Sequence, residues 1–282
     1  MTVSEIIKSA TEILRKSGIE QPRREANSLL AFALRKDRIF LIAHSEYKIS
    51  SQENGHFQSF LERRAKREPF QYIVGKQEFF GLDFAVSPDV LIPRSETEII
   101  VENALEILRE IESPRFCEVG VGSGCISVSI LHELENASAV GLDISENALK
   151  MAQKNAETHQ VFDRLTLQIS DVFDVLNNDK FDLIVSNPPY ISSEEMANLQ
   201  MEVGAFEPWT ALTDRKDGFS IIEKIIHDAP NFLKPSGFLL MEIGFGQSEK
   251  VSQMFERKIW QMSEILNDLQ GIPRTVRAQI SK

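Results

Sequence analysis

The residues best suited to chemistry are Asn187, Pro188, Pro189 and Tyr190, which directly follow the apolar run 181–186. The run predicts a buried strand, so the four residues are expected at a strand's exit, where open α/β sheets hold ligands. Two prolines remove two backbone N–H donors and stiffen the loop, which leaves the carbonyls there as unpaired acceptors. With the Asn187 amide oxygen and the flat face of Tyr190, the loop suits a planar group that carries an NH₂, such as an amide or a base amine.

A glycine loop upstream favours a binding site over an ordinary proline-rich turn. Segment 116–119 reads as a buried strand, and glycines at 120, 122 and 124 follow it before the apolar run 126–131 opens a helix. Glycine lets the backbone approach a ligand, and a helix N-terminus offers free N–H groups, so a nucleotide-like cofactor is predicted. Cys125 stands where the dinucleotide fingerprint has its third glycine, and the phosphate-binding G-x-x-x-x-G-K pattern is missing from the sequence.

The carboxylate of Asp143 ends the next predicted strand, 139–143. Doubly wound folds place an acid there to bind ribose hydroxyls, so Asp143 is predicted to be a ribose ligand. The same side chain also fits as the N-cap of a helix that begins near Ser145, and the two roles are compatible.

Seven strand candidates alternate with helical segments, which predicts an α/β fold with a doubly wound sheet. The last candidate alternates polar and apolar residues, as a partly exposed strand does, and an antiparallel partner is expected for it. The seven are 115–119, 139–143, 165–169, 181–186, 237–243, about 259–265, and 274–280.

The N-terminal part predicts a small helical domain followed by a hairpin. Apolar residues at helical spacing predict helices over 3–14, from Pro22 onward and over 51–66. The stretch 78–86 predicts a β-hairpin with its turn near Gly81. The predicted boundaries are 1–70 for the helical domain, 71–94 for the hairpin linker and 95–282 for the α/β domain.

Charge is spread unevenly over the 282 residues, whose net charge is −11. Residues 1–75 carry 13 Lys and Arg against 9 Asp and Glu, and the remainder carries 18 against 33. The acidic remainder argues against a broad nucleic-acid groove, whereas the basic N-terminal part suits an acidic protein. The dense cluster Arg63–Arg67 is predicted to be a solvated helix end, because cations suit helix C-termini.

The two cysteines, Cys117 and Cys125, lack His partners at ligand spacing, so neither a disulfide framework nor a metal site is predicted. No apolar run approaches the ~20 residues that span a bilayer, and the first residues lack a signal-peptide pattern. A cytoplasmic protein without a membrane partner is expected.

The motifs together resemble the S-adenosylmethionine-dependent methyltransferases of the seven-strand Rossmann-like type. The likeness rests on the glycine loop, the acid after the second strand, segment 170–173 and the Asn-Pro-Pro-Tyr stretch, in that order. It implies that the loop backs the methionine part of the cofactor, that Asp143 binds ribose and that Asp171 and Val172, or else Phe173, flank the adenine. Cofactor binding is thereby assigned to Glu118, Gly120, Val121, Gly122, Ser123, Gly124, Asp143, Ile144, Asp171, Val172 and Asn187, with S-adenosylhomocysteine as product.

Longer motifs narrow the likeness to one family and cover almost the whole chain. Segments 68–75, 78–82, 90–98 and 187–190 are similar to those of the HemK/PrmC family, the N5-glutamine methyltransferases of peptide chain release factors. Motifs of the same family continue, in the family's order, at 206–208, 217–219, 233–237 and 241–244.

The resemblance implies a substrate as well as a cofactor. The substrate is the glutamine of the release factor's Gly-Gly-Gln tripeptide, methylated on its side-chain amide nitrogen, which would modulate translation termination. Asn187, Pro188, Pro189 and Tyr190 are expected to bind it, with Asn187, Pro188 and Tyr190 catalytic. The helical domain and hairpin would help to hold the release factor.

Two other functions use parts of the same pattern. Asn-Pro-Pro-Tyr also occurs in methyltransferases that act on the exocyclic amine of adenine in DNA or RNA, and these must flip the base and grip phosphates. The acidic α/β part and the lack of a recognisable target-reading module speak against that alternative. A non-catalytic protein that binds a partner through the cofactor fold is the second, and the intact glycine loop, Asp143 and Asn187 disfavour it. Glu207 is a candidate proton acceptor or a salt-bridged structural carboxylate.

Overall fold

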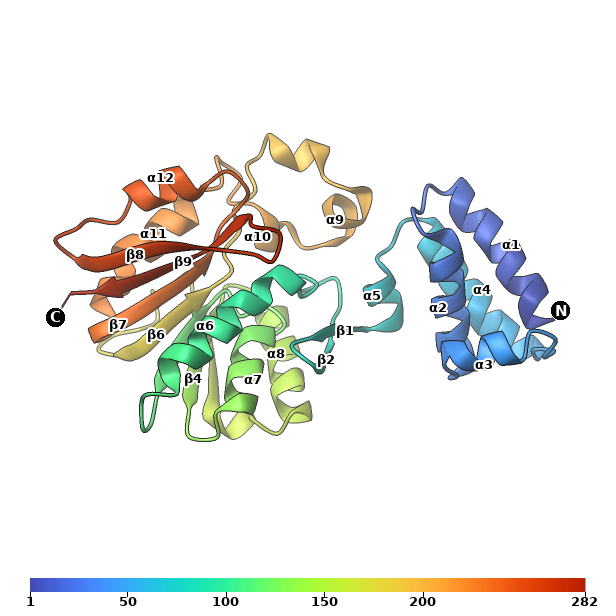
Figure 1. The fold of residues 1–282 in the computed structure, drawn as a ribbon, viewed down its shortest axis with the longest axis horizontal. Coiled ribbons are helices and arrows are strands. Elements are labelled where there is room, and N and C mark those ends of the chain that lie inside the picture. The colour runs from blue at the N-terminus through green and yellow to red at the C-terminus, as the bar shows by residue number, and fades with distance from the viewer. Residues whose placement is uncertain (282) are drawn as a thin grey trace. The chain divides into compact units, whose positions relative to one another are not determined.

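The computed structural model describes residues 1–281 (Figure 1). The chain divides into two compact units, of which the first combines Met1–Gly75 with Gln200–Phe206. The second combines Lys76–Leu199 with the chain from Glu207 onward. Within the described residues, no helix is both long and apolar enough to cross a membrane.

The first unit is a helical bundle around one apolar core. Leu14, Leu29 and Phe57 lie at its centre, and capping boxes at Thr2 and Ser50 begin two of its helices. The structure adds two short helices, α3 and α5, to the three that periodicity predicts. The helices of this unit are α1 Val3–Lys16, α2 Pro22–Leu34, α3 Arg38–Ala43, α4 Ser51–Ala65, α5 Phe70–Val74 and α9 Met201–Phe206.

The prediction of a solvated helix end at 63–67 is wrong for Arg64, whose side chain is only 7% exposed. Arg64 forms ion pairs with Glu25 and with Glu202, the latter at 3.2 Å from Nη2. Arg67 Nη2 lies 2.7 Å from the other Glu202 oxygen. Because a buried guanidinium needs partners, these pairs bind α9 to the helical unit. A segment from after residue 199 therefore completes a unit otherwise built from the first 75 residues.

The second unit begins with the predicted hairpin and continues into a seven-stranded sheet. The sheet has the order β5-β4-β3-β6-β7-β9-β8, in which β3 to β7 are parallel and β9 is antiparallel to both its neighbours. The doubly wound sheet and its antiparallel final strand are as predicted. The strands are β1 Lys76–Phe79, β2 Leu82–Ala85, β3 Arg115–Val119, β4 Ser138–Asp143, β5 Leu165–Ile169, β6 Phe181–Ser186, β7 Leu233–Glu242, β8 Trp260–Asn267 and β9 Pro273–Ile280.

Helices cover both faces of this sheet (Figure 1). Successive residues of β6 point to opposite faces, so Leu183 and Val185 join one apolar cluster while Ile184 joins the other. The first cluster packs against α6, α7 and α8, and the second against α11 and α12. The helices are α6 Glu98–Leu108, α7 Cys125–Glu133, α8 Glu146–Thr158, α10 Trp209–Leu212, α11 Ser220–Asp228 and α12 Ser248–Gln253.

The strand order sets the place of the site. β3 pairs with β4 on one side and with β6 on the other, so the connections that leave β3 and β6 diverge at a topological switch point. The glycine loop follows Val119 of β3, and Asn187 follows Ser186 of β6. The Ser186 hydroxyl donates to the Val119 carbonyl at 2.8 Å, which fixes the two strand ends together.

Candidate active site

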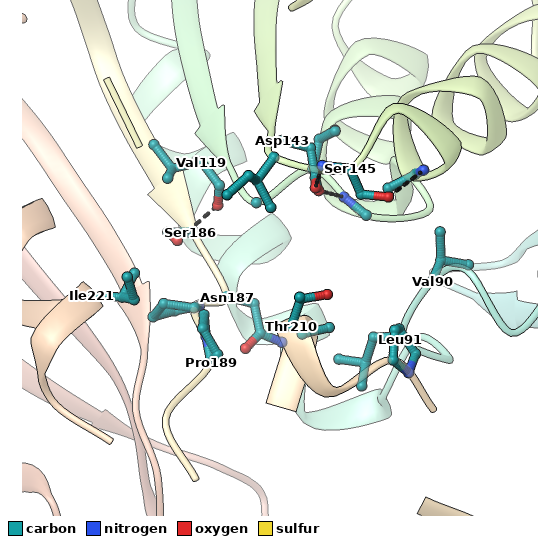
Figure 2. Close-up of a pocket in the computed structure, with 18 of the residues that line it drawn as sticks. Val90, Leu91, Val119, Asp143, Ser145, Ser186, Asn187, Pro189, Thr210 and Ile221 are labelled. Atoms are coloured by element: carbon teal, nitrogen blue, oxygen red, sulfur yellow. Dashed lines mark hydrogen bonds between the residues drawn. The ribbon is translucent and has the colours of Figure 1, made fainter. Parts of the chain in front are cut away.

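A cavity of about 290 Å³ lies at the carboxyl ends of the parallel strands (Figure 2). Its size is near the lower end of small-ligand sites. Gly124, which is the N-cap of α7, and Tyr190, whose hydroxyl donates to Glu242, are not among the residues that line it. The predicted residues that do line it are Glu118, Gly120, Val121, Gly122, Ser123, Asp143, Ile144, Asp171, Val172, Asn187, Pro188 and Pro189.

The glycine loop is locked against the neighbouring strand. Gly120 and Gly122 have φ of 75° and 54°, which side chains rarely adopt. The backbone N–H groups of Gly120 and Val121 both donate to the Leu142 carbonyl, at 2.8 and 2.9 Å. The Gly122 N–H donates to the Asp143 carboxylate at 2.9 Å. Hydrogen bonds within the protein therefore hold the loop in place.

Asp143 is oriented by backbone donors on both of its oxygens. Gly122 N–H donates to Oδ2 and Ser145 N–H to Oδ1, each at 2.9 Å. Burial raises the pKa of this carboxyl, and the N–H bonds oppose that rise. Ser145, not Asp143, is the N-cap of α8, since its hydroxyl accepts from Ala148 N–H. A carboxylate oxygen can accept a second bond, so Asp143 keeps capacity for ribose hydroxyls.

Glu118 is 1% exposed and accepts two bonds from Ser127, one from its backbone N–H and one from its hydroxyl. Burial raises the pKa of Glu118 to about 8. Five acidic side chains line the cavity, those of Asp89, Glu118, Asp143, Asp171 and Asp214, against two basic ones, Arg94 and Arg215. The excess of acidic groups and their acceptor oxygens fits a ligand that offers positive charge and hydroxyl groups, as S-adenosylmethionine does, better than it fits a pyrophosphate.

The segment after β5 contributes an aliphatic surface. Val172 lines the cavity and is only 6% exposed. Phe173, the alternative adenine contact, is instead buried in the core, where its ring packs 5.0 Å from that of Phe232. Of the two alternatives left open by the sequence, Val172 is the residue at the cavity.

The loop after β6 faces Asp143 across the cavity (Figure 2). Asn187 Nδ2 donates to the Thr97 hydroxyl oxygen at 3.1 Å. Among residues 1–281, no hydrogen bond occupies the Pro188 carbonyl oxygen. The Tyr190 hydroxyl donates to Glu242 at 3.1 Å, and burial raises its pKa well above the ordinary value, so it stays a proton donor. The motif thus presents one free carbonyl and one oriented amide.

Glu207 has the structural role that the sequence offered as an alternative. Its side chain is 1% exposed, is ion-paired with Arg94 and accepts the Ile92 N–H at 3.3 Å. Both oxygens are engaged in holding residues 92–94, and Glu207 is not among the residues that line the cavity, so it is not placed to act as the proton acceptor.

Two functional candidates were missed by sequence reasoning, Thr97 and Glu242. Glu242 is 2% exposed at the end of the apolar strand β7, and Thr97, also 2% exposed, donates to it at 2.6 Å. A carboxylate within an apolar run needs buried partners, and that was the available signal. The sequence gives no hint of which partners they are.

Sheet, glycine loop and carboxylate-lined cavity together define an S-adenosylmethionine-dependent methyltransferase domain. Two solved structures share the fold. The catalytic domain of hMettl16, solved with a MAT2A 3'UTR hairpin, has a TM-score of 0.58 at 16% identity over 72% of this chain and 76% of its own. The T. thermophilus 16S rRNA N2 G1207 methyltransferase RsmC has a TM-score of 0.52 at 15% identity over 73% of this chain and 50% of its own.

Sequence comparison identifies the family. Residues 5–75 match the PrmC N-terminal domain, and residues 97–203 match the methyltransferase small domain. The release factor glutamine methyltransferase of Geobacter sulfurreducens is 41% identical over 279 residues, which cover 99% of this chain and 97% of the relative. That of Koribacter versatilis is 36% identical over 98% of both chains. The chain belongs to the release factor glutamine methyltransferase family, as its motifs indicated.

Proposed function

We propose that this protein methylates the side-chain amide nitrogen of the glutamine in the Gly-Gly-Gln motif of peptide chain release factors. The observation that carries the proposal is the position of Asn187 and the free Pro188 carbonyl on the wall of the cavity that also contains the glycine loop and Asp143. Full-length relatives of the same family support the choice of substrate.

The cofactor half of the cavity is assigned to the glycine loop, Glu118 and Asp143, with Asp171 and Val172 beside the adenine. When bound, S-adenosylmethionine supplies an electrophilic methyl group carried on a sulfonium sulfur. Asp143 binds hydroxyl donors in this proposal, and acidic side chains outnumber basic ones along the cavity wall, which favours a cationic ligand.

Asn187 and Pro188 supply the positioning that an amide nucleophile needs. The nitrogen lone pair of an amide is delocalised into its carbonyl, which makes the nitrogen a poor nucleophile. Asn187 Oδ1 and the Pro188 carbonyl each accept one N–H of the substrate NH₂, and a proline face flanks the amide plane, while the Tyr190 hydroxyl bonds to Glu242. Such positioning is worth roughly 7–11 kcal/mol in favourable systems.

This arrangement needs no strong general base. The transferred methyl leaves the nitrogen with an extra, acidic proton that passes to water or leaves through Asn187. Glu207 is not assigned this role, because it pairs with Arg94 and is not among the residues that line the cavity. The two prolines offer no backbone donors, so their backbone presents only acceptors to the substrate.

We further propose that residues 1–70 and the hairpin within 71–94 help to hold the release factor, and that residues 95–282 perform the transfer. The excess of basic residues in the first 75 suits an acidic protein surface. Neither a stable nucleic-acid partner nor a membrane partner is proposed, and the protein is expected to act in the cytoplasm.

The direct test incubates the purified protein with S-adenosylmethionine and a matched release factor, and adenine-containing DNA and RNA are treated in parallel. Peptide mass spectrometry then locates any added methyl group. One methyl on the glutamine of Gly-Gly-Gln, with none on nucleic acid, is the expected result. Methylated adenine beside an untouched release factor would overturn the proposed substrate.

Asn187→Ala is expected to abolish detectable turnover while the dissociation constant of S-adenosylmethionine changes little, since the glycine loop and Asp143 remain. Single-turnover methylation and calorimetric titration measure the two quantities. Asn178→Ala is the matched control, because Asn178 is exposed in the loop before β6. Wild-type turnover in Asn187→Ala would contradict the proposed role.

A further inference from the structure

Four side chains form a continuous hydrogen-bonded chain that ends on Asn187. Asn187 Nδ2 donates to Thr97 Oγ1 at 3.1 Å, and the Thr97 hydroxyl donates to Glu242 Oε2 at 2.6 Å. The Tyr190 hydroxyl donates to the other oxygen of Glu242 at 3.1 Å. Thr97 and Glu242 are each 2% exposed, so bulk water does not replace these bonds. The chain joins the turn before α6, the end of β7 and the loop after β6.

The number of protons in this chain determines which end of the Asn187 amide faces the substrate. The Thr97 hydroxyl has one proton, and that proton is donated to the Glu242 carboxylate. Only lone pairs of Thr97 then remain for Asn187, which must present its NH₂ to them. The two ends of an amide have nearly the same shape, so packing alone does not choose between them. With Nδ2 turned to Thr97, Oδ1 is left to accept from another group.

The direction of hydrogen-bond donation along these four side chains depends on Glu242 being ionised. Burial and the nearby charge of Glu96 raise the pKa of Glu242, and the hydroxyls of Thr97 and Tyr190 and the Arg274 guanidinium oppose that rise. A neutral group here would donate to Thr97 and free the Thr97 proton for Asn187 Oδ1. Asn187 would then lose its preference for one orientation.

We propose that Thr97 and Glu242 are positioning residues that hold the Asn187 amide with its carbonyl oxygen toward the substrate. The inference rests on the proposed function, in which Asn187 Oδ1 accepts an N–H of the target glutamine. Because they set this orientation, Thr97 and Glu242 also determine which substrate side chain the site accepts. An acceptor at this place binds the NH₂ of glutamine and repels the carboxylate of glutamate, whereas the reversed amide would present donors and favour the carboxylate.

Two substitutions break the chain at different points. Thr97→Val keeps the shape of the side chain and removes the hydroxyl, so Asn187 Nδ2 loses its partner. Glu242→Gln introduces an NH₂ that donates to Thr97 and reverses the direction of the chain. Both are expected to lower kcat by about 10–100-fold, by analogy with the loss seen when hydrogen-bond partners of metal-binding residues are removed. The dissociation constant of S-adenosylmethionine is expected to stay within about twofold of wild type, since neither residue belongs to the cofactor half.

Thr97→Ser restores the hydroxyl and is expected to restore kcat. Thr275→Val is the matched control, because Thr275 lies opposite Glu242 on β9, is fully buried and has no hydrogen-bond partner for its hydroxyl among the described residues. It removes a buried hydroxyl beside the chain without breaking it. Turnover of Thr275→Val is expected to equal that of the wild type.

Substrate discrimination supplies a readout that a purely structural role would leave unchanged. A release factor whose target glutamine is replaced by glutamate serves as competitive inhibitor of methylation. Wild type is expected to bind it weakly, and Glu242→Gln is expected to bind it several-fold more tightly relative to the glutamine substrate. Equal discrimination in the two enzymes would overturn the proposal, as would wild-type kcat in Thr97→Val.

The outcomes separate this inference from the proposed function. If the wild-type protein methylates no release factor glutamine, the proposed function fails. If the wild type is active, Asn187→Ala is inactive and Thr97→Val and Glu242→Gln behave as wild type, only the positioning role fails. A kcat loss in Thr97→Val that accompanies an equal loss of cofactor affinity and a lowered melting temperature would also refute it.

Discussion

Gly218 fixes the backbone of the motif residue Tyr190, and replacing it tests how closely the active site depends on that position. Gly218 has φ of 81°, and a Cβ on it would lie 2.2 Å from the Tyr190 carbonyl oxygen and 2.9 Å from the carbonyl carbon. Asp214 accepts the N–H groups of Gly218 and Ser220, each at 3.0 Å, so the loop is held against Tyr190. Gln247 Nε2 donates to the same Tyr190 carbonyl at 2.9 Å.

The cost of Gly218→Ala has two parts. A left-handed backbone costs a side-chain-bearing residue roughly 1–2 kcal/mol. A carbon approaches a carbonyl oxygen to roughly 3.3 Å, so the contact at 2.2 Å requires Tyr190 or the 218 loop to move by about 1 Å. Misplacement of that size can cost about 10²-fold in rate even when its origin is far from the reacting atoms.

We therefore expect Gly218→Ala to lower kcat by about 10²-fold, with little change in the dissociation constant of S-adenosylmethionine. Steady-state methylation of a release factor and calorimetric titration of the cofactor provide the two numbers. Gly246→Ala is the matched control, since Gly246 has φ of 78° and its Cβ would meet no atom within 4 Å. It carries the backbone strain without the collision.

Wild-type kcat in Gly218→Ala would refute the reasoning, because the collision with Tyr190 would then have no functional effect. A loss of equal size in both variants would assign the effect to backbone strain. Only a loss confined to Gly218→Ala supports the argument that the place of Tyr190 limits turnover.

Two further predictions concern the cofactor half. Gly141→Ala would place a Cβ 2.8 Å from Leu167 and 3.0 Å from Val121 of the glycine loop. We therefore expect the free energy of unfolding to fall by about 1–3 kcal/mol and S-adenosylmethionine to bind more weakly. Unchanged affinity by calorimetry would contradict this. Burial raises the pKa of Glu118 from 4.5 to about 8, so between these values the folded state holds more protons than the unfolded state, and the free energy of unfolding falls as pH rises. This decrease in the free energy of unfolding is on the order of a few kcal/mol, and Glu118→Gln should reduce it. If the melting temperature of Glu118→Gln depends on pH as steeply as that of the wild type, the prediction is wrong.

The sequence alone was enough to predict those features that depend only on residues close together along the chain. Alternation and apolar runs predict the strands because a side chain's face follows from its place in the strand. The glycine loop, Asp143 and the Asn-Pro-Pro-Tyr stretch are local motifs, and each lies beside a strand end in the structure. Because strand ends of a doubly wound sheet meet at one edge, these motifs could be expected in one place, and the family followed from them.

Only the tertiary structure shows which side chains from distant segments form hydrogen bonds and ion pairs with one another. Thr97 meets Asn187 across 90 residues and Glu242 across 145, and no local pattern specifies such partners. The same holds for Arg64, which appeared solvated until Glu202, 138 residues away, proved to bond to it. Periodicity reports which face a side chain takes but not what lies opposite, and a buried polar group obtains its partner only when the segments pack. Sequence therefore determined the fold and the chemical groups, while packing determined their orientation.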